Sequence, residues 1–321
     1  MSEVGQFIYT PCRNRQLRSR KSVTLCYKYI FQFKPRPETL RTQENEKDKG
    51  NKCFNRLQTG RGHSSPSTIN VKRILDYTIS ELWAHAHRTF TYSDMAYFFH
   101  WWANRDETVR RMVYALIRQG RLDFVGGGWS MSDESTTSYH AIIDHYTYTL
   151  RKINSTFLEC GRPLVAWQAD VLGHSREFAS LMALMGFDGL FINPISFDDE
   201  LPRMRRKGLE FVWRGSDDLG PSSDIYAHKL YDGYWPPPGF CFGSQCSDPL
   251  LISSSDTFRN VIERVDEFVR LSQIRQAPYY TTKHIMVVMG MRDGYHDASV
   301  WFSNIDKLIQ FVSSPNNLKA G

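Results

Sequence analysis

Strands and helices alternate along most of this chain, and that alternation limits the fold more than any other feature. Apolar and β-branched runs typical of short strands lie at 89–93, 122–125, 164–169, 188–193 and 285–289. Apolar residues recur at helical spacing between them, for example over 69–86 and 176–185. Strands separated by helices of roughly 10–18 residues form βαβ units, so the sequence predicts an α/β fold with a mainly parallel sheet.

Several of the predicted strands end at or just before an acidic residue. These residues are Asp94, Asp133, Asp170 and Asp293. In α/β barrels and open α/β sheets the reacting groups lie at the C-terminal ends of the strands, where the loops converge. A single aspartate in such a place is more often a helix N-cap. The repeated position nevertheless predicts a pocket lined with carboxylates.

The first fifth of the chain differs from the rest in charge. Residues 1–68 hold 14 Lys and Arg against 5 Asp and Glu, whereas the whole chain of 321 residues has a net charge of only +6. This segment shows no sustained periodicity and no nucleic-acid-binding motif, so we interpret it as a basic, irregular and disordered arm. Only 23–33 within it has the β propensity of a strand.

The carboxylates are compatible with several chemistries. Paired carboxylates suit glycoside cleavage, a metal site completed by histidine, or passive sugar binding. Trp129, Trp167 and Tyr234 lie beside the candidate carboxylates and favour a carbohydrate over a phosphate. The run Gly126–Gly128 lacks the Lys-Ser/Thr pair and the helix start of phosphate-binding loops. A metal-dependent polysaccharide deacetylase is a further alternative, but the pocket-forming segments lack its His-x-x-x-His spacing.

Four motifs carry a resemblance to a known family. They are GGWSMSDE at 127–134, WQADVLGHS at 167–175, MGFDGLF at 185–191 and ASVWFSNIDKLI at 298–309. In this order they resemble the catalytic domain of family 38 glycoside hydrolases, of the lysosomal α-mannosidase type, from about Ile69 to about Ser313. We therefore expect 69–321 to be a catalytic domain that is truncated relative to this family.

The resemblance implies a retaining, zinc-dependent α-mannosidase that removes terminal α-mannose from oligosaccharides such as N-glycans, on a seven-stranded parallel (β/α) barrel. It makes Asp170 the nucleophile and a zinc ligand, and it places Tyr234 against the substrate. Trp129 and Asp133 are expected to line or support the same pocket. Asp293 comes one residue later than in the family's Met-Gly-x-Asp pattern and is the candidate general acid and base.

The chain departs from the family at the other expected zinc ligands. The family's first strand carries a His-x-Asp motif, but His63 is the only histidine upstream of the first helix, and Ser65 lies two residues after it. The resemblance places the last ligand, a histidine, beyond Gly321. The predicted barrel therefore lacks its first strand unless 23–33 supplies one. A non-catalytic mannose-binding remnant and a truncated gene product remain alternatives.

Further expectations concern processing, location and partners. The resemblance pairs Cys241 with Cys246, and Asn154 begins a glycosylation sequon, which both suit a lysosomal or secretory protein. Residues 1–10 lack the pattern of a secretory signal, and no stretch approaches the ~20 apolar residues of a membrane span. The expected partner is a mannose-containing oligosaccharide, with no nucleic acid and no membrane span. The sequence does not fix the oligomeric state.

Overall fold

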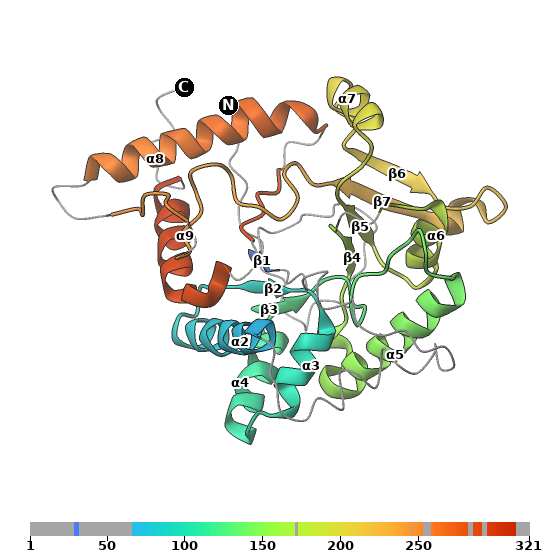
Figure 1. Cartoon of the computed structure of the whole chain (residues 1–321), viewed down its shortest axis with the longest axis horizontal. Helices are drawn as coiled ribbons and strands as arrows, with labels where there is room; N and C mark the ends of the chain where they lie inside the picture. The colour runs from blue at the N-terminus through green and yellow to red at the C-terminus, as the bar shows by residue number, and fades with distance from the viewer. Residues whose placement is uncertain are drawn as a thin grey trace.

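The computed structural model describes residues 66–170, 173–244, 246–252, 258–281, 285–290 and 294–312, together with the backbone of 29–31. Most of the strands lie near the centre of the described structure with helices around them, and two reach its right-hand edge (Figure 1). The helices are α2 (Pro66–Ala84), α3 (Met95–Ala103), α4 (Glu107–Arg118), α5 (Tyr139–Phe157), α6 (Arg176–Leu184), α7 (Phe197–Arg205), α8 (Phe258–Leu271) and α9 (Ala298–Val312). No described helix is both long and apolar enough to cross a membrane.

The first sheet has three parallel strands in the order β1-β2-β3. They are β1 (Tyr29–Phe31), β2 (Phe90–Tyr92) and β3 (Leu122–Phe124). Tyr29 pairs with Phe90, and Phe90 pairs with Leu122. β1 lies inside the segment 23–33 that the sequence singles out for its β propensity, and it adds a strand beside β2.

The second sheet has four strands in the order β4-β5-β7-β6. Its parallel strands are β4 (Val165–Gln168), β5 (Gly189–Ile192) and β7 (Asp224–Lys229), and the edge strand β6 (Glu210–Arg214) runs antiparallel to β7. The two sheets meet between β3 and β4, where the Gly126 amide donates to the Val165 carbonyl at 2.8 Å. The C-terminal ends of β2, β3 and β4 therefore face the same region.

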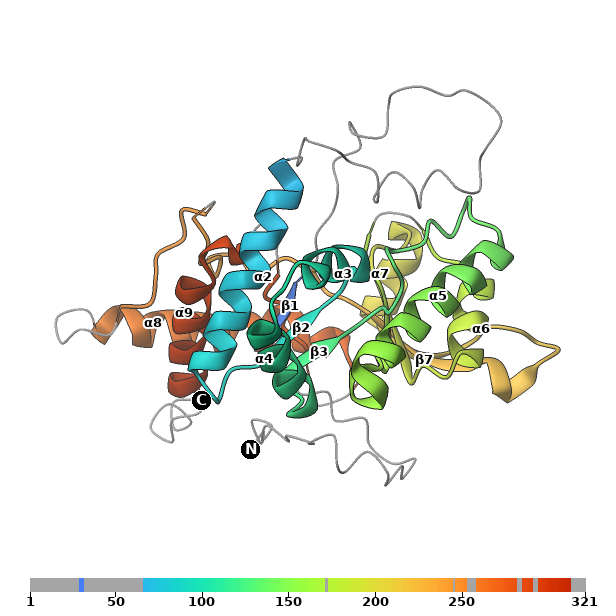
Figure 2. The ribbon, with the colours of Figure 1, turned by 90° about the horizontal axis from the view of Figure 1, so that it is seen from below.

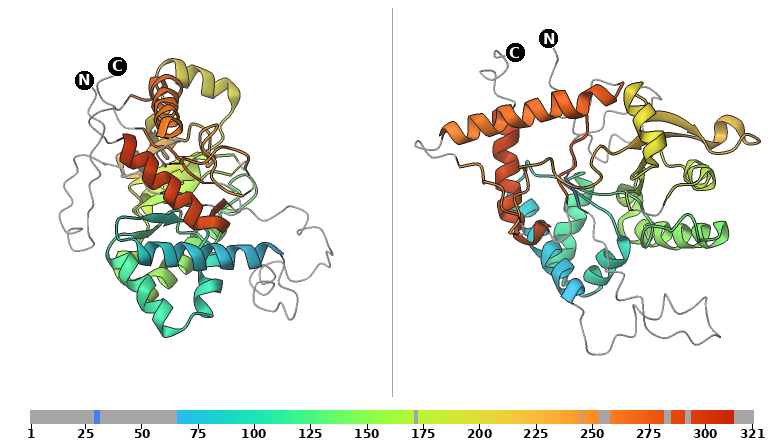
Figure 3. Two further views of the ribbon diagram at one scale, coloured as in Figure 1. Left: turned by 90° about the vertical axis from the view of Figure 1, so that its left-hand side faces the viewer. Right: turned by 45° about the horizontal axis from the view of Figure 1, so that its top comes forward.

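Helices cover the two sheets in separate groups. α9 packs against both α2 and α8 beside the first sheet, whereas α5 and α6 lie together along the second (Figures 2 and 3). One apolar cluster joins α2, α3, α4 and α9, and another packs α5 and α6 against β4 and β5. A third cluster lies at the strand ends and includes Val125, Trp167, Ala169, Phe191 and Leu230. This third cluster supports the region where the predicted site residues follow their strands.

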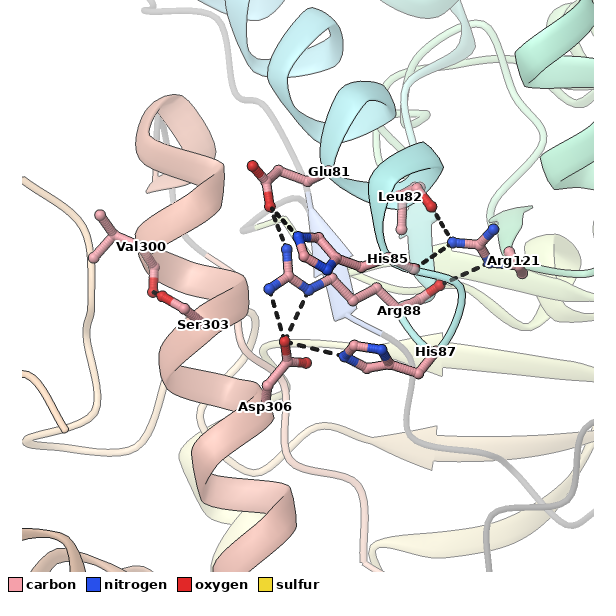
Figure 4. Close-up of polar contacts among 9 residues, drawn as sticks. All are labelled: Glu81, Leu82, His85, His87, Arg88, Arg121, Val300, Ser303 and Asp306. Carbon is pink, nitrogen blue, oxygen red and sulfur yellow. Dashed lines mark hydrogen bonds and ion pairs between the residues drawn. The ribbon is translucent and has the colours of Figure 1, made fainter. Parts of the chain in front are cut away.

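A buried arginine connects α2 to the last helix. Arg88, in the loop after α2, has only 6% of its side chain exposed and forms ion pairs with Glu81 and Asp306 (Figure 4). Its Nε and one terminal nitrogen each lie 2.8 Å from Asp306 Oδ2, and its guanidinium lies 5.3 Å from the centre of the Phe302 ring. Since Asp306 and Phe302 belong to α9, this contact fixes the last helix against the first sheet.

Some sequence-based predictions of the fold are wrong or incomplete. The apolar run 285–289 is not a strand: the Met286 carbonyl accepts from the Gln276 side chain, and the Gly290 amide donates to the Tyr234 carbonyl. The first partner is a side chain and the second is a loop carbonyl, so residues 285–290 do not form the backbone pairing of a strand. The sequence reading also omits β6, β7 and α7. A closed barrel of seven parallel strands is not confirmed, because the described strands form two sheets and β6 is antiparallel.

Candidate active site

The candidate site lies where β2, β3 and β4 end. Asp94 follows β2, Gly126–Gly128 follow β3, and Asp170 follows β4. A small pocket at these ends is lined by Ser93, Asp94, Gly126–Gly128, Ser130 and Trp167, among others. Of the four aspartates that follow predicted strands, Asp94 lines this pocket and Asp170 lies at the end of a neighbouring strand. Asp293 lies outside the described residues.

Glycines shape the pocket wall after β3. Gly126 and Gly127 have φ angles of +76° and +75°, which side-chain-bearing residues rarely adopt. A Cβ on Gly128 would lie 2.7 Å from the His145 ring. The Nε2 atom of His145 accepts the Ser130 amide at 3.0 Å, and burial lowers the pKa of His145 to about 4. A neutral imidazole on α5 therefore holds the loop that forms one wall of the pocket.

Asp170 is the first residue after β4 whose side chain is not fully buried. Trp167, Gln168 and Ala169 are at most 2% exposed, whereas Asp170 is half-buried. On β2, which β3 separates from β4, burial and then the charge of Asp94 raise the pKa of Tyr92 well above its usual value. The strand end thus brings the Asp170 carboxylate out of an apolar cluster whose Trp167 lines the pocket. Its role as the nucleophile stays a prediction.

Glu134 is a buried residue of this region to which the sequence reading assigns no role. Its side chain is 2% exposed and lies in the loop after β3. It accepts hydrogen bonds from Gln168 Nε2 at 2.9 Å and from the Ser175 amide at 2.7 Å, and its Oε1 lies 3.2 Å from His174 Nδ1. These contacts join the loop after β3 to both ends of the segment that contains Asp170. In the sequence, only its position next to Asp133 indicates that Glu134 belongs to this region.

Asp133 and Trp129, which the sequence places at the pocket, contact other protein residues. The Asp133 carboxylate accepts from the amide and hydroxyl of Ser135 at 3.1 and 2.7 Å, and the hydroxyl contact lowers the pKa of Asp133. This agrees with support of a loop rather than reaction. The Trp129 ring stacks on Phe99 with 6.2 Å between centroids and packs against Tyr148. Contact of either residue with a sugar stays a prediction.

Tyr234 lies in the loop after β7. It packs against the apolar cluster that contains Trp167 and Ala169, and its ring stacks on Trp235 with 5.5 Å between centroids. An adjoining cavity of about 190 Å³ is lined by Asp232 and Trp235, among others. Burial raises the pKa of Asp232 above its usual value, against the opposing charge of Lys229. An aromatic ring and a carboxylate beside a cavity are compatible with a sugar ligand.

The two processing sites predicted from the sequence lie among the described residues. Cys241 and Cys246 form a disulfide, with their Cα atoms 5.8 Å apart. Asn154 lies exposed near the end of α5, so its side chain is open to glycan attachment, which stays a prediction.

The described residues do not form the zinc site that the resemblance implies. Among them, no three His, Cys, Asp or Glu side chains come together in a group that could hold a metal ion. Zinc in proteins takes about four ligands, and Asp170 is the only described residue to which the resemblance assigns that role. The described residues therefore do not fit a zinc ion by themselves.

Comparison with known proteins agrees with this arrangement. Residues 58–320 match the glycosyl hydrolases family 38 N-terminal domain. The chain is 42% identical over 253 residues to lysosomal alpha-mannosidase of Cavia porcellus and 35% identical over 257 residues to alpha-mannosidase of Canavalia ensiformis. Each alignment covers 78% of this chain and 25% of the relative. The chain thus spans about a quarter of the length of these relatives.

The fold also has a counterpart among solved structures. The crystal structure of an alpha-mannosidase from Enterococcus faecalis V583 superposes with a TM-score of 0.52 at 13% identity, over 76% of this chain and 26% of that one. At this identity the likeness concerns the fold alone, an α/β glycoside hydrolase domain. Since the family match covers most of the chain, the chain belongs to glycoside hydrolase family 38.

Proposed function

We propose that residues 69–321 form an α-mannosidase domain that hydrolyses terminal α-mannose from oligosaccharides with retention of configuration, behind a basic arm at 1–68. The observation that carries this proposal is the position of Asp170 just after β4, the strand whose Trp167 lines the glycine-walled pocket, in a chain of family 38. In this proposal the two sheets correspond to the family's seven-stranded parallel (β/α) barrel.

The proposed reaction has two steps. Asp170 attacks the anomeric carbon, the glycosidic bond breaks, and a covalent mannosyl-enzyme forms while Asp293 donates a proton to the leaving oxygen. Asp293 then takes a proton from a water molecule, which releases mannose and frees Asp170. Tyr234 is proposed to contact the sugar, with Trp129 and Asp133 supporting the pocket. The names of the lysosomal relatives favour a lysosomal or secretory location.

Zinc belongs to this proposal only with donors from outside the described residues, because those residues supply a single ligand in Asp170. The same observation favours a second candidate, a protein that binds mannose without cleaving it. Both candidates bind mannose, but only the first hydrolyses α-mannosides.

Hydrolysis of an aryl α-mannoside by the chain and its Asp170→Asn variant tests the proposal. The matched control is Asp188→Asn, which makes the same change at an exposed residue before β5, at the opposite end of the strands. We expect Asp170→Asn to lower kcat on the order of 10³-fold or more, and Asp188→Asn to leave it unchanged. Equal activity of all three proteins would refute the role of Asp170. Mannose binding without turnover in the unchanged chain would favour the second candidate.

A further inference from the structure

One buried carboxylate contacts the segment around Asp170 at both of its ends. Glu134 Oε1 accepts from Gln168 Nε2 at 2.9 Å, two residues before Asp170. It also lies 3.2 Å from His174 Nδ1, while Oε2 accepts from the Ser175 amide at 2.7 Å, four and five residues after Asp170. All three donors belong to the stretch between the end of β4 and the N-cap of α6.

We propose that Glu134 is a positioning residue that holds Asp170 in its reactive place. This inference rests on the proposed function, because it concerns the residue assigned there as nucleophile. Gln168 is 1% exposed and lies in β4, and Ser175 caps α6 by accepting the Phe178 amide at 3.1 Å. Both anchors therefore belong to regular elements. By binding both, Glu134 shortens the free length of chain on each side of Asp170 and limits its movement.

The chemistry of the three contacts requires a carboxylate. An ionised carboxylate only accepts hydrogen bonds, so His174 Nδ1 carries a hydrogen toward it. The Gln168 amide is oriented the same way, because its Nε2 also donates to the Ser132 carbonyl at 2.8 Å. A glutamine at position 134 has one acceptor oxygen, and its NH₂ group would face one of these donors. At least one buried donor would then lose its partner.

The neighbouring acidic residues do not share this role. The Asp133 carboxylate bonds to Ser135 in its own turn. Glu177 lies exposed in the first turn of α6. It lies two residues after Ser175 and outside the set of contacts that Glu134 makes, so Glu177→Gln is a matched control for Glu134→Gln.

The test compares the unchanged chain with Glu134→Gln, Gln168→Met and Glu177→Gln, using two measurements. Hydrogen exchange with mass spectrometry reports opening of the stretch 168–178. Steady-state hydrolysis of an aryl α-mannoside separates kcat from KM. Gln168→Met keeps the carboxylate and the side-chain length and removes one contact to Glu134, together with the Gln168 bond to the Ser132 carbonyl. It decides the question if Glu134→Gln does not fold.

We expect exchange over 168–178 to rise at least about tenfold in Glu134→Gln, to rise less in Gln168→Met, and to stay unchanged in Glu177→Gln. We expect kcat to fall on the order of 10²-fold in Glu134→Gln, with KM within about threefold, since substrate contacts remain. Unchanged exchange over this stretch, or kcat equal to that of the control, would overturn the inference. If the unchanged chain does not turn over substrate, the proposed function fails, and the exchange comparison still decides whether Glu134 holds the loop.

Discussion

Replacement of Arg88 by methionine tests how the last helix is held. Arg88 is 6% exposed and pairs with Glu81 and Asp306, whose side chains are each 23% exposed (Figure 4). Loss of one partner from a buried ion pair costs about 3–5 kcal/mol, because the remaining charges stay buried without compensation. Glu81 and Asp306 keep some contact with water, so we expect the lower end, about 3 kcal/mol of unfolding free energy.

The matched control is Arg111→Met, which removes an exposed pair on α4. Arg111 and Glu107 are 78% and 66% exposed and lie 3.1 Å apart, so this change should cost less than about 0.5 kcal/mol. Urea unfolding followed by tryptophan fluorescence measures both variants. At 2–4 °C per kcal/mol, Arg88→Met should also lower Tm by roughly 6–12 °C. Equal midpoints for the two variants would refute the conclusion that the Arg88 contacts fix α9 to the first sheet.

Two further predictions concern the loop after β3. The pKa of His145 is about 4 in the folded chain and about 6.5 in the unfolded chain. Between these pH values the unfolded chain binds more protons. The free energy of unfolding therefore falls as the pH drops from 6.5 toward 4, by about 3 kcal/mol in total. His145→Gln should flatten this part of the stability–pH curve, and an unchanged slope in urea titrations would contradict the assignment. Gly127→Ala should destabilise the fold by at least about 1 kcal/mol, because φ is +75° and the new Cβ would lie 2.6 Å from the Pro163 ring. A denaturation midpoint equal to that of the unchanged chain would count against this crowding.

The sequence predicts most of the helices and several strands because their signals are local. Asp106 caps α4, with its side chain accepting the Val109 amide at 2.9 Å, and an aspartate at such a position is a local signal. The strands β2, β3, β4 and β5 lie within the predicted apolar runs. β6 gave no such signal, because its residues are half-buried or exposed along its whole length, as suits an edge strand.

The missed features depend on contacts between distant residues. The run 285–289 is apolar because Met286 and Val288 pack into the cluster at the strand ends, and a burial pattern alone does not distinguish this from a strand. The role of Glu134 depends on the return of the chain to His174 and Ser175, some forty residues away. Motif matching located Asp170, but neither composition nor spacing could identify the buried carboxylate that contacts both sides of it.

Trapping of the covalent intermediate tests the central claim most directly. A fluorinated mannosyl fluoride reacts with the nucleophile of a retaining enzyme and leaves a slowly hydrolysed mannosyl ester, which mass spectrometry of peptides locates. We predict one added sugar on the peptide that contains Asp170, and none in Asp170→Asn. A label on another carboxylate, or no label in a chain that hydrolyses α-mannosides, would contradict the assignment of Asp170 as the nucleophile.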